Sequence, residues 1–275
     1  SLKGLDLVGT GDILNPVWRE HVRESTETLG NGTMEAENGT RFLLTAEVED
    51  EDRVHHLLMF PSYGTVEDVH DDFARFSSDI DDEGRPRLEL SGEEIARTCE
   101  RYDVLIGPAH AFTPWTSVYK DFDSLKGCYG NSTDVLSFLE LGLSADTPLA
   151  DSITEHHDMT FVSFSDAHSP WPHRLGREFT RFEAQDLNFR ELEKAFERKG
   201  GRGTILNAGF DPREGKYHCS ACSGCYQKYT RKQAEKFGWT CQECGKRIKK
   251  GVRDRIEELS DTEVGDSPPF RPKYI

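Results

Sequence analysis

Short apolar runs alternate with segments of helical spacing along most of the chain. The apolar runs predict strands over 5–8, 41–46, 54–60, 103–109, 161–164 and 203–208. Apolar residues recur at helical spacing over 16–29, 66–76, 91–102, 132–141 and 187–198, and the stretches 31–39 and 79–87 are polar and predict loops. Strands that alternate with helices indicate an α/β fold with a largely parallel sheet or barrel.

Residues of metal-ligand type follow the C-terminal ends of these apolar runs. They are Asp12, Glu47, His110, Asp166 and His168. In a (β/α) barrel that end of the strands forms the active face. Each residue alone is more simply explained as part of a turn, but a set restricted to carboxylates and imidazoles favours one shared metal site. Such donor sets suit Zn, Mn or Fe, and these ions support hydrolysis.

Competing catalytic signatures and membrane segments are not found in the sequence. There is no serine nucleophile elbow and no dinucleotide fingerprint, and Gly9-Thr10-Gly11 is too short to cradle a phosphate. No apolar run approaches membrane-spanning length and no signal peptide is visible, which favours a soluble, cytoplasmic protein. The first residue is Ser1, so we expect an internal piece of a longer protein.

Five of the seven cysteines lie between Cys219 and Cys244. Cys222 with Cys225 and Cys241 with Cys244 form two Cys-x-x-Cys pairs, a spacing typical of a zinc site. Four thiolates leave no open position for water, so we expect one structural zinc on which this segment depends for folding. Cys219, three residues before Cys222, is an alternative ligand.

The charge is distributed unevenly along the chain. The formal net charge is −16, yet residues 210–256 carry an excess of +7 and the remainder carries −23. A basic segment attached to an acidic body favours binding of a polyanion. Its lysines and arginines can contact phosphates and its aromatic residues can stack on bases, although a solvated surface around the zinc is the simpler alternative. Candidate contacts are Lys228, Arg231 and Lys249.

Several motifs resemble a known family. The stretches 9–12, 54–58, 107–110 and 165–168, with Glu47, resemble successive motifs of the polymerase-and-histidinol-phosphatase (PHP) phosphoesterase superfamily. The longer strings 5–18, 107–119 and 165–179 and the cysteine segment resemble its endonuclease Q members. The resemblance implies a distorted (β/α) barrel with a multinuclear site for Zn, Mn, Mg or Fe. It also implies cleavage of DNA on the 5′ side of deaminated bases (uracil, hypoxanthine, xanthine) or abasic sites.

The resemblance also assigns residues to the site. It implies that the metal ligands, which are also the catalytic residues, are Asp12, Glu47, His56, His110, Asp166 and His168. We prefer His56 over His55 because His-Leu-Leu matches the superfamily pattern, and we expect His55 to point to the other side of its strand and pack there. His173 and Arg174 are candidates for holding the phosphate or for a structural role.

One departure and two alternatives remain open. The superfamily begins with a His-x-His strand, and this chain has none, so we expect an incomplete barrel and little nuclease activity from these residues alone. The expected division is a PHP-like barrel over 1–209, a basic four-cysteine zinc module over 210–256 and a linker over 257–275 toward a missing part. The alternatives are a PHP-family phosphatase acting on a small phosphomonoester, which would not need a basic zinc module, and an inactive nucleic-acid-binding protein.

Overall fold

The computed structural model describes residues 3–143, 145–215, 217–263 and 267–275. Its largest sheet is six-stranded, in the order β2-β3-β4-β5-β6 with β1 beside β4. The strands are β1 (Leu7–Gly9), β2 (Thr26–Thr28), β3 (Thr33–Ala36), β4 (Arg41–Glu49), β5 (His55–Phe60) and β6 (Leu105–Pro108). β1 runs parallel to β4, and the other pairs in this sheet are antiparallel.

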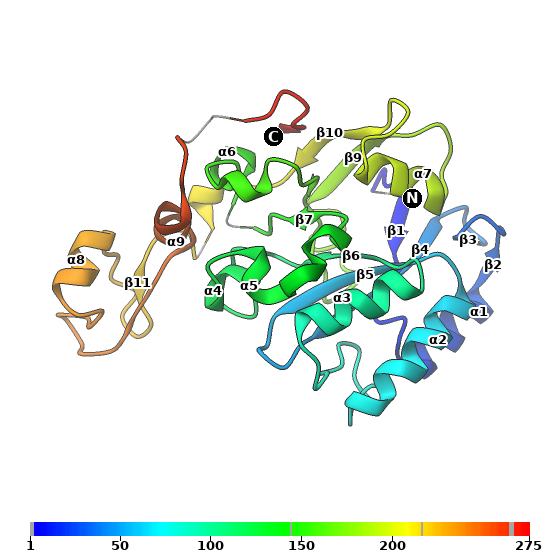
Figure 1. Ribbon diagram of the computed structural model, residues 1–275, viewed down its shortest axis with the longest axis horizontal. Helices are drawn as coiled ribbons and strands as arrows, with labels where there is room; N and C mark the ends of the chain where they lie inside the picture. The colour runs from blue at the N-terminus through cyan, green and yellow to red at the C-terminus, as the bar shows by residue number, and fades with distance from the viewer. Residues whose placement is uncertain (1–2, 144, 216, 264–266) are drawn as a thin grey trace.

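Shorter sheets continue from the edge of β6 (Figure 1). They contain β7 (Leu139–Glu140), β8 (Phe161–Val162), β9 (Phe179–Glu183), β10 (Gly203–Ala208) and β13 (Lys273–Tyr274). A parallel bridge joins Ile106 to Leu136, β7 pairs in parallel with β8, and the amide of Asn207 on β10 donates to the carbonyl of Phe161 on β8. β10 pairs with β9 in antiparallel and with β13 in parallel orientation.

Helices cover the outer face of the main sheet (Figure 1). The helices of the body are α1 (Pro16–Ser25), α2 (Tyr63–Phe73), α3 (Gly92–Arg101), α4 (Val118–Asp121), α5 (Leu125–Tyr129), α6 (Thr147–Ala150) and α7 (Phe189–Phe196). Short 3₁₀ segments are η1 (Ala74–Phe76), η2 (Gly130–Val135), η3 (Thr154–His156) and η4 (Pro212–Glu214). Ser91 caps α3 and forms a capping box with Glu94.

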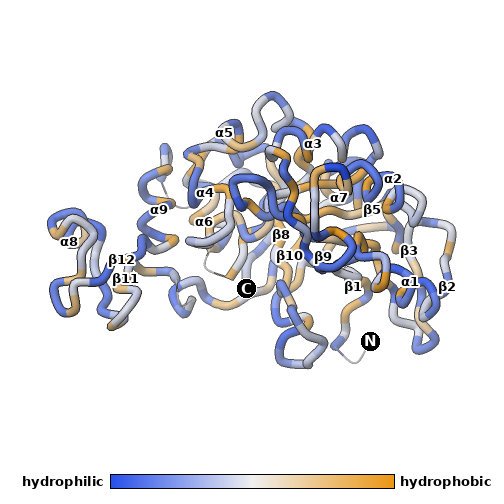
Figure 2. Tube along the Cα trace, turned by 90° about the horizontal axis from the view of Figure 1, so that it is seen from below, coloured by the Kyte–Doolittle hydropathy of each residue, from blue (hydrophilic) through white to orange (hydrophobic). Residues whose placement is uncertain are grey.

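Alternation along the strands divides the buried side chains between two clusters. Leu44 and Leu58 point into the larger core beneath the helices, whereas Leu43 and Met59 point into a second cluster with residues of α7. Figure 2 shows the hydrophobic residues gathered along the central strands. Among the described residues, no helix combines the length and the hydropathy that a membrane crossing requires.

The cysteine segment forms a small lobe at one end of the molecule (Figure 1). It contains β11 (Ala221–Cys222), α8 (Arg231–Lys236) and β12 (Ile248–Lys249), and it leads into α9 (Val252–Leu259). The guanidinium of Arg255 on α9 donates to the carbonyls of Tyr119 and Phe122, which fastens the lobe to the body. Residues of 257–275, expected to form a linker, also contact the body, because β13 pairs with β10.

The mixed α/β class is confirmed, and three sequence-based assignments are wrong. The sheet is not largely parallel: β4 and β5 are joined by the short turn 50–54, which permits only antiparallel pairing. The helix expected over 132–141 is instead the turn η2 followed by β7, since a short apolar run does not distinguish strand from helix. The polar loop expected over 31–39 contains β3, in which Met34 is buried.

Candidate active site

The β4–β5 hairpin places an acidic and an imidazole side chain on one face of the sheet. Glu49 pairs with His55 across the two strands, and Glu47 lies two residues earlier on β4, so all three side chains share a face. The distance from Nδ1 of His55 to Oε1 of Glu47 is 2.7 Å. Because β5 runs against β4 and β6, its first residue lies at the edge where those two strands end.

His110 joins this pair from the end of β6. The amide of Ala109 donates to the carbonyl of His55, and Nε2 of His110 lies 3.2 Å from Nδ1 of His55. One ligand atom from each of Glu47, His55 and His110 therefore lies within 4.8 Å of the others. A carboxylate oxygen and two imidazole nitrogens at this separation form a donor set that fits a divalent transition ion.

The structure places His55, rather than the predicted His56, in this cluster. His56 is fully buried on the opposite face of β5, where its ring lies 3.1 Å from Oδ2 of Asp50 and 2.8 Å from the hydroxyl of Tyr129. Successive side chains of a strand point to opposite faces, so only one of the two histidines can reach Glu47. The sequence did not reveal which face the site would occupy.

Asp12, Asp166 and His168 gather around the same cluster. The pKa of Asp12 is raised by burial and by the nearby charge of Glu47, while His168 and Arg85 act in the opposite direction. Nδ1 of His168 lies 3.5 Å from Oδ1 of Asp166. β8 ends at Val162, so these two residues lie beyond the strand in a segment without regular secondary structure.

Three of the candidate ligands have a left-handed backbone. The φ angles are 47° at Asp12, 32° at His110 and 42° at Asp166. Residues other than glycine rarely adopt positive φ, and such positions concentrate at functional sites because the surrounding fold must hold them there. The turn of Asp12 is fixed by hydrogen bonds from Thr10 and Ile13 to carbonyls of β4.

Charges within the cluster strongly influence the acidity of Glu47. Burial alone would raise its pKa, but the hydrogen bond with His55 and the charges of His110 and Arg85 outweigh burial and lower the pKa to about 2. Burial lowers the pKa of His110, against the opposing effect of Glu47. Glu47 therefore remains a carboxylate, and carboxylates are the form that binds cations.

A further buried carboxyl group, Glu140, was not predicted from the sequence. It ends β7, accepts a hydrogen bond of 2.9 Å from the amide of His110, and is 4% exposed. Burial raises its pKa to about 8, and the charges of Asp166 and Glu47 add to the effect. Its position inside an expected helix concealed it, although a lone glutamate between apolar neighbours in 138–141 was the available signal.

A cavity of about 580 Å³ opens beside the cluster. His55, His110, Asp166 and His168 are among the residues that line it. Trp115, Tyr217 and Lys249 also line it, and the Lys249 ammonium lies 4.7 Å from the centroid of the Trp115 ring. Since Lys249 belongs to β12, the cysteine lobe forms part of the wall of this cavity.

The other predicted substrate contacts lie elsewhere. His173 and Arg174 are exposed on the turn after Trp171 and do not belong to the cavity lining. Arg231 forms ion pairs with Glu235 and, at 3.6 Å, with Glu258. Lys228 is exposed, and its backbone bridges to Ala221.

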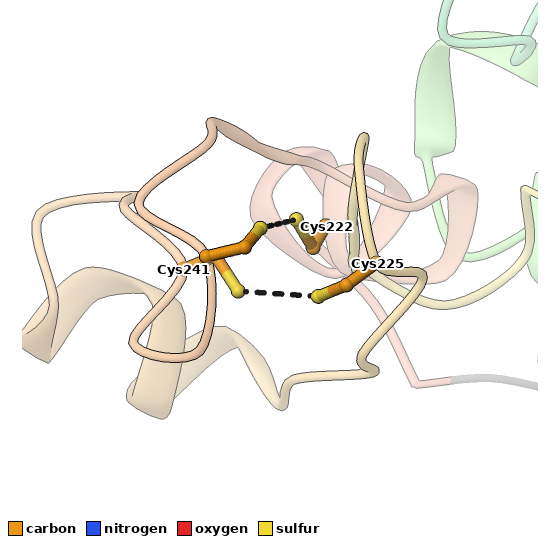
Figure 3. A group of neighbouring side chains, drawn as sticks. Cys222, Cys225 and Cys241 are labelled. Carbon is orange, nitrogen blue, oxygen red and sulfur yellow. Dashed lines mark hydrogen bonds between the residues drawn. The ribbon is translucent and has the colours of Figure 1, made fainter.

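The paired cysteines converge as their spacing predicts. Sulfur atoms of Cys222 and Cys244 are 3.3 Å apart, those of Cys225 and Cys241 are 3.5 Å apart, and all four lie within 4.8 Å of one another. Figure 3 shows the side chains of Cys222, Cys225 and Cys241 turned toward each other. The Tyr229 hydroxyl donates to Cys241 and lowers the pKa of that thiol to about 6. Cys219 is not part of this group among the described residues.

No protein-family model matches the chain. The crystal structure of the lesion-specific endonuclease PfuEndoQ from Pyrococcus furiosus matches all of it with 55% identity and a TM-score of 0.94. A complex of endonuclease Q with a 27-mer duplex substrate carrying an abasic lesion at the active site matches with 54% identity and a TM-score of 0.95. The chain belongs to the endonuclease Q family. The family assignment made from the sequence is thereby confirmed.

Two further relatives of this chain are uncharacterized proteins. MJ0043 of Methanocaldococcus jannaschii is 48% identical over 179 residues, which is 63% of this chain and 22% of that protein. YqxK of Bacillus subtilis is 30% identical over 99% of this chain and 70% of its own length. The chain spans 67% and 68% of the two solved endonuclease Q chains.

Proposed function

We propose that this chain is the catalytic region of a metal-dependent DNA repair endonuclease, which cuts the phosphodiester on the 5′ side of a deaminated base or an abasic site. The observation that carries the proposal is the cluster of Glu47, His55 and His110, which borders the same cavity as Lys249 of the basic lobe. A metal-ligand set beside a cationic wall suits a phosphodiester substrate. The solved relative bound to abasic duplex supports DNA as the partner.

The residues that would hold divalent ions are Glu47, His55 and His110, with Asp12, Asp166 and His168 around them. His55 takes the place that the sequence gave to His56. When bound, such ions supply Lewis-acid activation of water and neutralise charge on the phosphate. The donor set admits Zn, Mn or Fe, and the four thiolates of the lobe suit a structural zinc.

The remaining side chains of the cavity would bind and orient the substrate. Lys249 and Arg85 bring positive charge to the place where the DNA backbone would lie, and they attract phosphate without reading sequence. Trp115 offers an aromatic face on which an unpaired base can stack. Lesion recognition of this kind requires the base to leave the helical stack, which is easiest at a damaged or unpaired position.

The proposed function gives the two parts of the chain different roles. We assign catalysis to a PHP-like barrel over 1–209 and DNA contact to the basic four-cysteine module over 210–256. Residues 257–275 would then join the module back to the body. The relatives come from prokaryotes, so we propose a cytoplasmic location with the genome.

The test is a nicking assay on the natural gene product with Mn²⁺, Mg²⁺ or Zn²⁺. Duplexes containing uracil, hypoxanthine or an abasic site are compared with an undamaged duplex and a phosphomonoester. We expect nicking that depends on both the lesion and the metal, and a loss of at least about 100-fold in the variant His55→Gln. His70→Gln, which makes the same change on α2 away from the cavity, should retain activity.

Other outcomes identify the alternatives. Phosphate release from the monoester without nicking would identify a phosphatase. Salt-sensitive DNA binding without any product would identify a nucleic-acid-binding protein without catalysis.

A further inference from the structure

His55 is held between two acidic groups on opposite sides of its ring. Its Nδ1 faces Glu47 and His110, whereas its Nε2 lies 3.1 Å from Oε2 of Glu49. Glu49 is two residues after Glu47 on β4 and therefore projects from the same face of the sheet. The carboxylate of Glu49 lies outside the cluster of ligand atoms and contacts the imidazole on its Nε2 side.

Arginines and the neighbouring backbone hold Glu49 in place. The guanidinium of Arg87 donates to Oε1 of Glu49 at 2.7 Å, and Arg53 lies 3.4 Å from the same oxygen. The amide of Leu88 donates to the Glu49 carbonyl, and the Glu49 amide donates to the carbonyl of Pro86. With Oε1 engaged in this way, Oε2 is left to accept from His55, and the carboxylate is 7% exposed.

An imidazole that gives one nitrogen to a metal carries its proton on the other nitrogen. A partner that accepts this proton fixes the tautomer, orients the ring and increases the basicity of the coordinating nitrogen. Two tautomers of His55 have a hydrogen-bond acceptor. A proton on Nδ1 would be accepted by Glu47, and a proton on Nε2 would be accepted by Glu49. Only the second arrangement leaves both Nδ1 and Glu47 available to an ion.

We propose that Glu49 is a positioning residue that holds the proton of His55 on Nε2 and so prepares Nδ1 for the metal. The inference rests on the metal site proposed above and adds a residue that neither the sequence motifs nor the cluster itself identified. A merely structural role is the alternative, in which Glu49 links β4 to the segment around Arg87. The two roles differ in their effect on metal affinity.

Affinity for Mn²⁺ distinguishes these roles in the full chain with its cysteine site loaded with zinc. Electron paramagnetic resonance counts free Mn²⁺, which thiolates bind poorly, so the four cysteines do not interfere. We expect Glu49→Gln to weaken Mn²⁺ binding by about 10- to 100-fold. The glutamine amide can donate a hydrogen bond to Nε2 of His55, so the proton of His55 would no longer be held on that nitrogen. Glu67→Gln, an exposed ion-pair partner of Arg23, makes the same charge change and should leave the affinity unchanged.

The outcomes separate the inference from the metal site itself. Binding by Glu49→Gln within twofold of the wild type would refute the positioning role and leave the metal site standing. Failure of the wild-type chain to bind Mn²⁺ would refute both. If Glu49→Gln does not fold, nitrogen-15 NMR of wild-type His55 with diamagnetic Zn²⁺ decides: a proton on Nε2 supports the inference, and a proton on Nδ1 overturns it.

Discussion

Arg271 and Asp151 form a buried ion pair whose loss should strongly destabilise the protein. Their side chains are 4% and 0% exposed, and Nε of Arg271 lies 2.7 Å from Oδ1 of Asp151. The guanidinium also donates to the carbonyl of His156 at 2.6 Å and lies 3.6 Å from the centroid of the Phe161 ring. Replacing Arg271 by methionine would leave the Asp151 carboxylate buried without a counter-charge, which costs about 3–5 kcal/mol of unfolding free energy.

A double-mutant cycle measures this interaction. Urea denaturation is followed by circular dichroism for the wild type, Arg271→Met, Asp151→Leu and the double variant, all with zinc present. We expect each single change to cost about 3–5 kcal/mol and the double change to cost much less than their sum, because it removes both charges. As a control, Arg23→Met breaks the exposed pair with Glu67 and should cost less than about 1 kcal/mol.

Two results would refute this reasoning. Either the Arg271→Met variant loses less than about 1 kcal/mol, or the double variant loses the full sum of the two single changes. In the first case the pair would behave like a surface salt bridge. In the second, the loss would come from the packing of each side chain and not from the interaction between the charges.

Two further predictions concern the lobe and the sheet. Cys241→Ser should remove the tightly bound metal of the cysteine site and unfold the lobe, whereas Cys219→Ser should retain about one equivalent of metal in elemental analysis; equal retention by both variants would contradict the four-thiolate site. Gly107→Ala should lower stability by about 1–3 kcal/mol in thermal unfolding, because its Cβ would clash with the backbone carbonyl oxygen of Phe138. Gly203→Ala should not lower stability, because no atom lies within 4 Å of its added Cβ. Similar losses of stability in both variants would show that the clash at position 107 is not the cause.

The residue types of the site could be predicted from the sequence better than the identity of each ligand. Carboxylates and imidazoles after apolar runs indicated where Asp12, Glu47 and His110 lie, because strand ends meet at one edge of a sheet. His55 and His56 are both flanked by apolar residues, and local sequence cannot show which face of β5 is covered by helices. That face is determined by α2 and α3 packing against β5, which is a long-range property.

The errors in the fold have a related physical origin. The turn 50–54 between β4 and β5 is too short for a parallel crossover, and its length was visible in the sequence. Glu140 was hidden for a different reason: an apolar stretch of four residues fits either a helix or a strand, and only the pairing of β7 with β8 decides. The buried carboxyl group of Glu140 could therefore not be recognised until β7 was known to be a strand.

The net charge of the body gives a misleading impression of what its cavity can bind. The sequence outside 210–256 carries −23, which suggests repulsion of DNA. Yet the cavity is lined by Arg53, Arg85, Lys120 and Lys249 against the acidic Glu49 and Asp166. At physiological salt, exposed charges beyond about 8 Å are largely screened, so the nearby cations decide the attraction that a phosphate experiences at the site. Lys249 comes from the basic lobe, so the lobe forms part of the wall of the cavity, and under the proposed function it would also assist the approach of DNA.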